Sequence, residues 1–388
     1  MSIKLLVISP LPPTRTGIAE YAHEFYKALS NELNLFILTN KTDVRGEFHP
    51  NTKFESIENL ASLKLLKQII RSVNEHNIKY VHIQVGLRTF GDHLKSSFIT
   101  LTSLILLRLM GKRPVVTIHT IPTKWALANF FKGKRKKKFQ AFITYIVYRL
   151  YINLISKFSW KIIVHLDAIK KYLITLHQVK QKKIVVLPHG TMCRKGFVDL
   201  SSEIILFHGF LRESKGLDKL LDAYVNIENW EGLLLKLMGP PHMGEISYLK
   251  SLITKIKKLE RIKKIQVKLK HLNPDEIMDE ITKAKIIVLP YEDYFLEASG
   301  VLAKAACSGT PIICSKIPKF YFEKEYREYL TFFEPGDKED LKNKIIEVLN
   351  NYEVFKSKAK KLKNIAEKRT WDKIAKKFAE IIVLSNGK

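Results

Sequence analysis

The sequence predicts an α/β protein built from two doubly wound parallel-sheet domains that face each other across a cleft. Its 388 residues suggest two domains, at about 150 residues per domain. Short runs of consecutive apolar residues alternate with longer helix-like segments, as they do in parallel sheets whose strands are buried on both faces. The pattern begins again near residue 200, after Pro188-His189-Gly190 and a polar stretch. We therefore expect a first domain over 1–195 and a second over 196–370.

The predicted strands are short apolar runs bounded by polar or turn residues. In the first half of the chain they are 3–8, 34–38, 79–84, 114–118 and 161–165. In the second half they are 184–187, 203–208, 232–238, 265–268, 286–289 and 311–314. Ligands of doubly wound sheets bind outside the carboxyl ends of the strands, so residues directly after these runs are the candidates for chemistry.

The composition limits the partners and the compartment. Lysine and arginine number 66 against 38 acidic residues, a formal net charge of +28. Such a charge favours nucleic acid, an anionic membrane or phosphorylated substrates as partners. The three cysteines form no C-x-x-C pair, which suggests neither a zinc site nor a disulfide framework and fits a reducing compartment. With no signal peptide and no uncharged apolar run of about 18 residues, we expect a soluble or peripheral cytoplasmic protein.

A loop with two cations and two glycines follows directly after the predicted strand at 203–208. It runs from Gly209 to Gly216, carries Arg212 and Lys215, and precedes a predicted helix. Backbone N–H groups, the helix dipole and both cations can then point at one phosphate group. A solvated arginine and lysine are the alternative, because such residues are common in so basic a chain.

A second group of candidates follows the strand at 286–289, at the start of another predicted helix. The group consists of Glu297, Ser299, Gly300 and Val301. A carboxylate can bind sugar hydroxyls, and the amides at a helix start can bind a pyrophosphate. The alternative is an exposed glutamate in an acidic loop, since Glu292 and Asp293 are close by.

Two single residues complete the candidates. His119 ends the strand at 114–118, where an imidazole can form a hydrogen bond or act as a base. A lone histidine is more often structural. Gly17 follows the first strand and permits close approach of the backbone to a ligand, or it simply forms a turn. Its loop is not a G-x-G-x-x-G, so the dinucleotide fingerprint is absent.

Together these motifs resemble the large family of retaining glycosyltransferases with the GT-B fold, usually called family four or glycosyl transferases group 1. The resemblance runs over nearly the whole length of the chain. It rests on Gly-Ile-Ala-Glu-Tyr (17–21), Val-Thr-Ile-His (116–119), Leu-Pro-His-Gly (187–190), the loop 209–216, the block from Glu-Ala-Ser-Gly-Val-Leu to Gly-Thr-Pro (297–311), and Trp-Asp-Lys-Ile-Ala (371–375).

The resemblance implies transfer of a hexose-like sugar from a nucleotide-diphosphate donor to a lipid-linked or polysaccharide acceptor, with retention and without a metal or other cofactor. Arg212 and Lys215 would hold the diphosphate and neutralise the leaving phosphate, which helps to deprotonate the acceptor. Glu297 would contact donor-sugar hydroxyls, and His119 would touch the transferred sugar from the opposite domain. The other residues expected to line the donor site are Gly17, Gly209, Ser299, Gly300 and Val301. The helix of segment 371–388 would cross back onto the first domain.

One departure from the family pattern concerns its second glutamate, which usually binds the nucleotide ribose. Counting from Glu297 puts Ala305 at that place, and counting back from Gly309 puts Lys304 there. This departure weakens any expectation about nucleotide identity. Two rival functions stay open: another GT-B enzyme, such as an inverting transferase or a sugar-nucleotide epimerase, and a non-catalytic basic binding protein.

A basic and aromatic stretch predicts a membrane-surface element. The cations are Lys132, Lys134, Arg135, Lys136, Lys137 and Lys138, and apolar residues at helical spacing continue to Leu154. A basic cluster that runs into an apolar helix is typical of binding to an anionic membrane. The alternative is a solvated charge run before an ordinary core helix. No recognised module supports nucleic acid as the partner.

Overall fold

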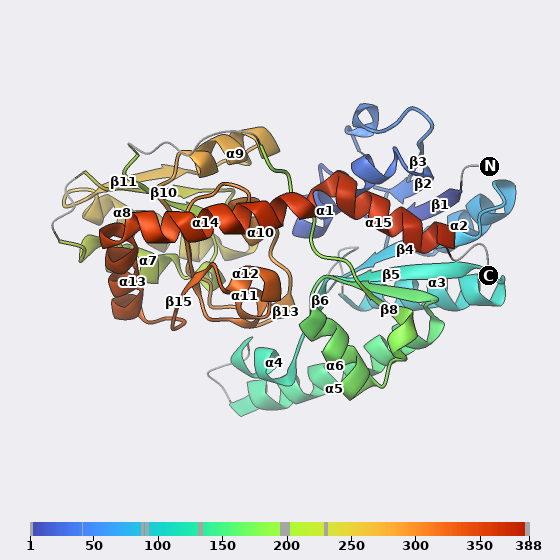
Figure 1. Cartoon of the computed structure of the whole chain (residues 1–388). Helices are drawn as coiled ribbons and strands as arrows, with labels where there is room; N and C mark the ends of the chain where they lie inside the picture. Colours follow the sequence, from blue (N-terminus) through green and yellow to red (C-terminus); the bar gives the residue numbers. More distant parts are fainter. Residues whose placement is uncertain are drawn as a thin grey trace. The chain divides into compact units, whose positions relative to one another are not determined.

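A computed structural model describes residues 3–40, 42–86, 89, 93–130, 135–194, 202–228 and 232–384. The chain forms two compact units. The first comprises Met1–Gly190, Phe295–Ala298 and Arg369–Lys388, and the second comprises Thr191–Tyr294 and Ser299–Lys368. Each unit is described by itself below (Figure 1).

The first unit is built on a parallel 7-stranded sheet with the order β3-β2-β1-β4-β5-β7-β8. Its strands are β1 (Lys4–Ile8), β2 (Asn34–Thr39), β3 (Lys53–Ser56), β4 (Tyr80–Val85), β5 (Arg113–Ile118), β7 (Lys161–Val164) and β8 (Ile184–Val186). The central strands are buried along almost their whole length, which explains their uninterrupted apolar runs.

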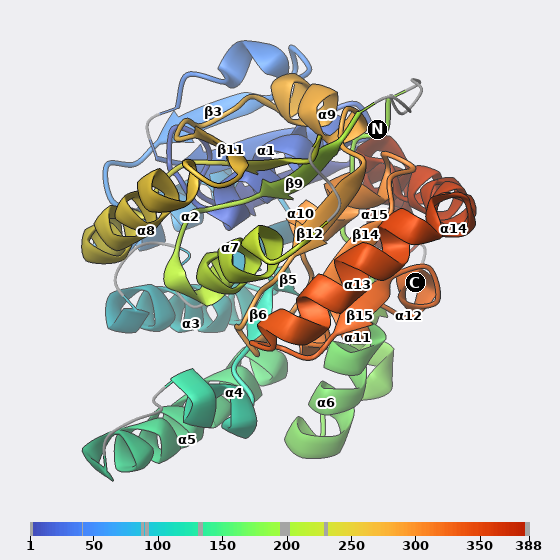
Figure 2. The ribbon, with the colours of Figure 1, turned by 90° about the vertical axis from the view of Figure 1, so that its left-hand side faces the viewer.

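Helices follow the strands of the first unit in alternation. They are α1 (Gly17–Leu29), α2 (Leu63–Glu75), α3 (His93–Leu109), α4 (Lys124–Phe130), α5 (Arg135–Phe158), α6 (Asp167–His177) and α15 (Trp371–Leu384). Two short strands, β6 (Thr120–Ile121) and β13 (Leu296–Glu297), form a separate antiparallel pair. Helix α4 lies along α5 and packs on it (Figure 2).

The second unit repeats the same plan with a parallel 6-stranded sheet of order β11-β10-β9-β12-β14-β15. Its strands are β9 (Ile204–His208), β10 (Leu234–Met238), β11 (Lys264–Lys268), β12 (Ile286–Leu289), β14 (Ile312–Ser315) and β15 (Thr331–Phe333). Its helices are α7 (Leu217–Val225), α8 (Ile246–Leu259), α9 (Pro274–Thr282), α10 (Gly300–Ala306), α11 (Pro318–Tyr321), α12 (Lys324–Arg327), α13 (Lys338–Asn350) and α14 (Tyr352–Ala366).

The prediction of two doubly wound parallel-sheet domains is confirmed. Every strand predicted from the sequence is present, with ends that differ by at most two residues. The strands that were not predicted are β3, β6, β13 and β15. Strand β3 is polar and lies at a sheet edge, and the other three have only two or three residues each. Apolar periodicity carries too little signal over such segments.

The terminal helix α15 packs on α1 within the first unit. Its Trp371 lies against Gly190, where any Cβ would overlap the indole ring. The same indole contacts the rings of Tyr21 and His189 edge-on or tilted. Glycine at position 190 therefore lets the C-terminal helix approach the end of the first unit's sheet.

The expectation of no disulfide is wrong. Cys193 and Cys307 are joined by a disulfide within the second unit, with their Cα atoms 5.0 Å apart. The two positions are separated by 114 residues in sequence, so only the fold brings them together. Cys314 is buried as a free thiol. Within the described part of the chain, no helix has both the length and the apolar character needed to cross a bilayer.

Candidate active site

The carboxyl ends of the central strands in the second unit come together at glycines. Gly209 directly follows β9, and its N–H donates to the carbonyl oxygen of Met238 at 3.1 Å. Gly239 directly follows β10 with φ at +144°, and a Cβ there would overlap the carbonyl oxygen of Gly209. The two segments therefore run side by side past the sheet edge only because position 239 lacks a side chain. The predicted residue Gly209 lies at the ligand-binding edge of a doubly wound sheet.

Arg212 and Lys215 are brought together by an acidic residue that follows β12. The Arg212 Nη2 atom lies 3.6 Å from Asp293 Oδ2, and the Lys215 Nζ atom lies 3.5 Å from the same oxygen. Lys215 Nζ also lies 3.4 Å from the ring centroid of Tyr291, a close cation–π contact. Helix α7 begins directly after Gly216, so both cations precede a helix N-terminus as predicted.

Asp293 also pairs with a third cation, Lys319 of α11. Both side chains are almost completely buried. Burial by itself would raise the pKa of Asp293, but Lys319, Lys215 and Arg212 together lower that pKa, and the carboxylate stays ionised. One carboxylate thus contacts three cations. The innermost pair is Asp293 with Lys319, and the partly exposed members are Lys215 and Arg212.

Polar atoms of the 209–216 loop are buried without a protein partner. Within the described residues, the Arg212 Nε atom and the Ser214 hydroxyl form no hydrogen bond. Buried donors of this kind normally find a partner in protein, water or a ligand. An oxyanion beside the loop would satisfy both of them.

Ser299, Gly300 and Val301 begin the seven-residue helix α10. The Ser299 hydroxyl is the N-cap and accepts a hydrogen bond from the Leu302 N–H at 3.2 Å. Ser299 was predicted to line the donor site. In the structure its hydroxyl oxygen caps the N-terminus of α10. The amides of Gly300 and Val301 occupy the first turn, where N–H groups have no acceptor within the helix.

His119 lies in the first unit, between β5 and β6, and its ring is half-buried. Its Nε2 atom is 2.6 Å from the Gln84 Oε1 atom, and its ring packs edge-on against Tyr21, with centroids 4.8 Å apart. Burial lowers the pKa of His119 well below its ordinary value, and nearby His165, His189 and His82 lower it further. The imidazole is therefore neutral near pH 7, and it can form hydrogen bonds but is not an acid.

Glu297 lies beside His119 in the same unit. Strand β13 pairs antiparallel with β6, and Glu297 is opposite Thr120. The Thr120 hydroxyl donates to Glu297 Oε2 at 2.7 Å. The sequence places Glu297 in the second domain, opposite His119; the structure groups it with the first unit, because Leu296 packs in that unit's core.

Gly17 is the first residue of α1, directly after the N-cap Thr16. Among the described residues, no heavy atom lies within 4 Å of where its Cβ would be. The backbone at Gly17 is therefore open on that side, as a ligand contact would require. The first unit thus contains Gly17, His119 and Glu297, and the other predicted residues lie in the second unit.

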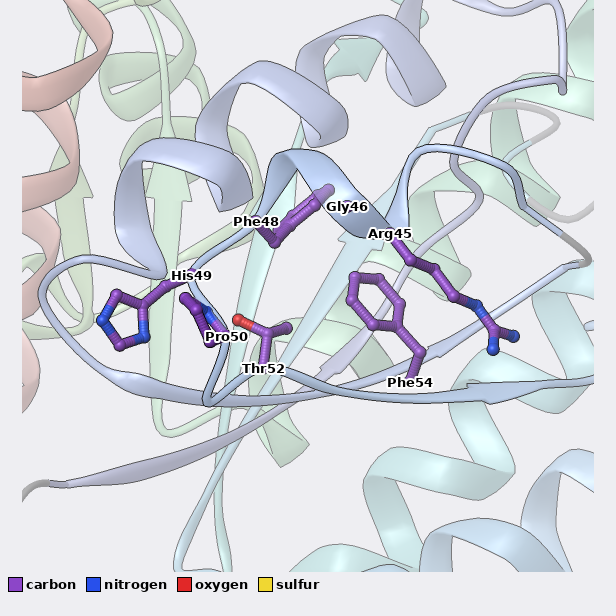
Figure 3. A pocket seen from close by; sticks show the side chains of 7 residues that line it. All are labelled: Arg45, Gly46, Phe48, His49, Pro50, Thr52 and Phe54. Carbon is purple, nitrogen blue, oxygen red and sulfur yellow. The ribbon is translucent and has the colours of Figure 1, made fainter.

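One hollow of about 420 Å³ lies elsewhere in the first unit (Figure 3). It is lined by Arg45, Gly46, Phe48, His49, Pro50, Thr52 and Phe54. None of the predicted site residues lines it, so it does not belong to the candidate site. Within the described residues, no cluster of histidine, cysteine or acidic side chains could hold a metal ion.

Sequence reasoning missed Asp293, Lys319 and Gln84 as site residues. Asp293 was noted only as part of an acidic loop, although it directly follows Pro290-Tyr291-Glu292 after β12. Its position after a strand was an available signal. Lys319 and Gln84 carry no such signal, because only tertiary contacts bring them to Asp293 and His119.

Comparisons with known proteins concern the family and the fold. Residues 193–369 match the family model described as "Glycosyl transferases group 1". The chain is similar to the Anabaena Alr3699/HepE structure in complex with UDP, with a TM-score of 0.71, 15% identity, and coverage of 98% of this chain and 100% of that one.

Two further structures cover almost the same length. Sucrose-phosphate synthase (tll1590) from Thermosynechococcus elongatus has a TM-score of 0.74 at 15% identity, covering 99% of each chain. A glycosyltransferase from Rickettsia africae has a TM-score of 0.71 at 15% identity, covering 98% of this chain and 97% of that one. No curated protein sequence matches the chain. Residues 193–369 are thus similar to the glycosyl transferases of group 1, and over its whole length the chain has the GT-B fold.

Proposed function

We propose that the chain transfers a hexose-like sugar from a nucleotide-diphosphate donor, with retention and without a metal ion, to a lipid-linked or polysaccharide acceptor. The observation that carries the proposal is the cation cluster around Asp293. Asp293 holds Lys215 and Arg212 at 3.5 and 3.6 Å, at the carboxyl end of the second sheet. The guanidinium of Arg212 and the ammonium of Lys215 are positively charged, which complements a diphosphate.

The proposed roles of Arg212 and Lys215 follow from the place where negative charge develops during the reaction. As the bond between the sugar and the diphosphate breaks, negative charge accumulates on the leaving phosphate, and Arg212 and Lys215 stabilise it. Because Asp293 already holds both side chains in place, little reorganisation is needed at that moment. A retaining reaction on one face of the sugar lets the leaving phosphate accept the proton of the acceptor hydroxyl. No protein nucleophile is then required.

The donor sugar contacts are assigned to the first unit. Glu297, hydrogen-bonded to Thr120, offers carboxylate oxygens to sugar hydroxyls, and neutral His119 offers a ring nitrogen. UDP, UDP with glucose, and UDP-glucose are bound in structures of Anabaena HepE. Uridine diphosphate sugars are therefore the first donors to test.

A screen of nucleoside diphosphates for thermal stabilisation tests the donor assignment. A ligand at about 100 times its Kd adds about 2.7 kcal/mol to the free energy of unfolding. We expect one diphosphate to raise Tm in EDTA, and the Arg212→Ala variant to lose the effect. Turnover of the matching sugar nucleotide, followed by the anomeric configuration of the product, tests retention. If no diphosphate stabilises the protein and DNA or RNA does so at physiological salt, the basic binding protein is the better interpretation.

A membrane-bound acceptor is favoured by the exposed face of α5. Its exposed apolar side chains repeat at i, i+3, i+4, i+7, i+8, i+11 and i+15, and each is at least 37% exposed. They are Phe139, Phe142, Ile143, Ile146, Val147, Leu150 and Leu154. An ordinary core helix would bury these residues, whereas α5 already buries a different face through Ile152 and Ile155. An apolar face of this size in contact with water is typical of an interaction surface.

Neighbouring helices also carry exposed apolar side chains. Trp125 of α4 and Leu94 and Phe98 of α3 are more than half exposed, and both helices pack on α5. The predicted basic cluster lies at the N-terminus of α5. Its Lys132 and Lys134 lie outside the described residues, and 135–138 are helical with side chains that are not described.

Helix α5 is also linked to the sugar contacts, through a residue on the side opposite its apolar face. The Tyr148 hydroxyl of α5 donates to the Thr120 carbonyl oxygen at 3.1 Å, and the Thr120 hydroxyl bonds Glu297. An acceptor held at a membrane under α5 would therefore be near the proposed sugar site. We propose that the first unit binds an anionic membrane peripherally, on its cytoplasmic face.

Co-sedimentation with vesicles tests the membrane proposal. We expect stronger binding to anionic vesicles than to neutral ones, because each cation near an anionic leaflet contributes about 1 kcal/mol. Binding should weaken with salt, since the attraction is screened. Replacing the six cations of 132–138 with glutamine should abolish the preference for anionic vesicles. Phe139→Ser with Phe142→Ser should remove the part that resists salt.

A matched control variant removes six positive charges from the second unit instead. It replaces six exposed lysines of the second unit with glutamine: Lys250, Lys257, Lys258, Lys358, Lys360 and Lys361. This variant should bind vesicles like the wild type. If it loses binding as strongly as the 132–138 variant, the attraction is a general effect of net charge. A soluble acceptor is then the better assignment.

A further inference from the structure

A line of hydrogen-bonded polar side chains runs through the interior of the first unit and ends at His119. Its members come from α1, β4 and β5, and most are completely buried. In order they are Thr117, His82, Tyr26, Gln84 and His119. None of them except His119 has a role in the proposed reaction.

Gln84 connects the interior members of the line to His119 at its outer end. Its Oε1 atom lies 2.6 Å from His119 Nε2, and its Nε2 atom donates to the Tyr26 hydroxyl at 2.7 Å. The side chain of Gln84 is 0% exposed, so water does not compete for these bonds. The backbone of His119 is held as well, since its N–H donates to the Val85 carbonyl oxygen at 2.9 Å.

The orientation of the Gln84 amide, with its nitrogen toward Tyr26, sets the direction of the other hydrogen bonds in the line. The Tyr26 oxygen is 3.0 Å from His82 Nδ1, and His82 Nε2 is 2.8 Å from the Thr117 hydroxyl. Burial raises the pKa of Tyr26 far above its ordinary value and lowers that of His82 to about 3, so both side chains are neutral. Tyr26 has one hydrogen and already accepts from Gln84, so it donates to His82 Nδ1.

The same rule applied along the line determines the state of His119. His82 accepts at Nδ1, carries its hydrogen on Nε2 and donates to Thr117. Gln84 donates through its amide nitrogen to Tyr26, so its oxygen faces His119 and can only accept. His119 must then carry its hydrogen on Nε2, and its Nδ1 atom keeps a free electron pair.

We infer that Gln84 is a positioning residue that holds His119 in the Nε2-protonated tautomer, so that Nδ1 accepts a hydrogen bond from a hydroxyl of the transferred sugar. The inference rests on the proposed function for the identity of that partner. It predicts a preference for donors that carry the hydroxyl, because a deoxy sugar would leave Nδ1 without a donor on binding. The tautomer itself is independent of the reaction.

Nitrogen-15 NMR of histidine-labelled protein tests the tautomer directly. A wild-type spectrum at neutral pH should show His119, identified by its loss in His119→Asn, with a protonated Nε2 and an unprotonated Nδ1. Gln84→Leu removes the acceptor, and the His119 signals should then move toward a mixture of both tautomers. Gln84→Glu keeps an acceptor of the same shape, so the Nε2-protonated form should persist while the carboxylate raises the pKa of His119.

Kinetics and binding measured on the same variants connect the tautomer to the reaction. Gln84→Leu should lower kcat/KM for the donor about tenfold, the scale of one hydrogen bond. Its affinity for the free nucleoside diphosphate should be unchanged, because the proposed diphosphate contacts lie in the second unit. Gln84→Glu should retain more activity near neutral pH and acquire a new acidic limb in its pH profile. Gln68→Leu, the same change on α2 outside the line, is the control and should behave like the wild type.

The outcomes separate this inference from the proposed function. If His119 keeps a protonated Nε2 in Gln84→Leu, or has a protonated Nδ1 in the wild type, the inference is overturned whatever the enzyme transfers. If Gln84→Leu changes the tautomer but not kcat/KM, the positioning role is overturned. A wild-type protein that binds no nucleoside diphosphate contradicts the proposed function, while the tautomer measurement still decides the assignment of Gln84.

Discussion

Replacing Lys215 with alanine is expected to lower turnover by about a hundredfold or more, the scale for losing one charge-stabilising donor. Arg212→Ala should have an effect of the same order. Both side chains pair with Asp293, but Lys215 is the more enclosed, with 12% of its side chain exposed against 32% for Arg212. A buried cation interacts more strongly with developing charge than an exposed one. Lys215→Ala should therefore be the more damaging change.

Steady-state rates with the donor identified by thermal stabilisation measure this effect, and circular dichroism checks the fold. The matched control is Lys255→Ala, a lysine of the same unit that pairs with Asp222 on α7 at 2.7 Å. It should lose little activity, because a partly exposed ion pair contributes about 1 kcal/mol or less to stability. Wild-type rates in both Arg212→Ala and Lys215→Ala would refute the role assigned to the loop.

Replacing Glu297 with glutamine is expected to impair turnover more than it impairs binding of the nucleoside diphosphate. Glutamine keeps the shape of the side chain, and its amide oxygen can still accept the Thr120 hydrogen bond. What is lost is the negative charge offered to sugar hydroxyls. A hydrogen bond to a charged group contributes about 1.5–3 kcal/mol, so kcat/KM should fall by about ten- to a hundredfold.

The binding measurement distinguishes two places for the Glu297 contact. Titration calorimetry with the nucleoside diphosphate should give a Kd close to that of the wild type, because the proposed contact is to the sugar. Equal losses in turnover and diphosphate affinity would place the contact on the nucleotide instead. Glu260→Gln, at an exposed site after α8, is the control and should change neither quantity.

The strands that sequence reasoning found share a physical property. Consecutive apolar residues such as Ile286-Ile287-Val288-Leu289 are needed only where a strand is covered on both faces, so their pattern is unambiguous. Strand β3 lies at a sheet edge and reads Lys-Phe-Glu-Ser, which is indistinguishable from a loop. Edge strands need not be apolar, and many carry charges.

Site residues that directly follow a strand could be predicted from the sequence. Site residues that are placed by contacts with distant parts of the chain could not. Arg212 and Lys215 were identified because a loop between a strand and a helix is a recurrent anion site. The place of Glu297 depends on β13 pairing with Thr120, 177 positions away in sequence. The Lys319–Asp293 pair and the Cys193–Cys307 disulfide likewise join residues whose proximity no local pattern encodes.

The four residues Phe295–Ala298 belong to the first unit although the chain on both sides belongs to the second. Any chimaera that exchanges the second unit with that of a relative therefore also replaces Leu296 and Glu297. The four residues from the relative must then pair with Thr120–Ile121. One of them must also fill the position of Leu296 in the core of a first unit from another protein. We therefore expect a chimaera to fold only when it keeps Phe295–Ala298 of the protein that supplies the first unit. The two units are thus less interchangeable than their separate sheets suggest.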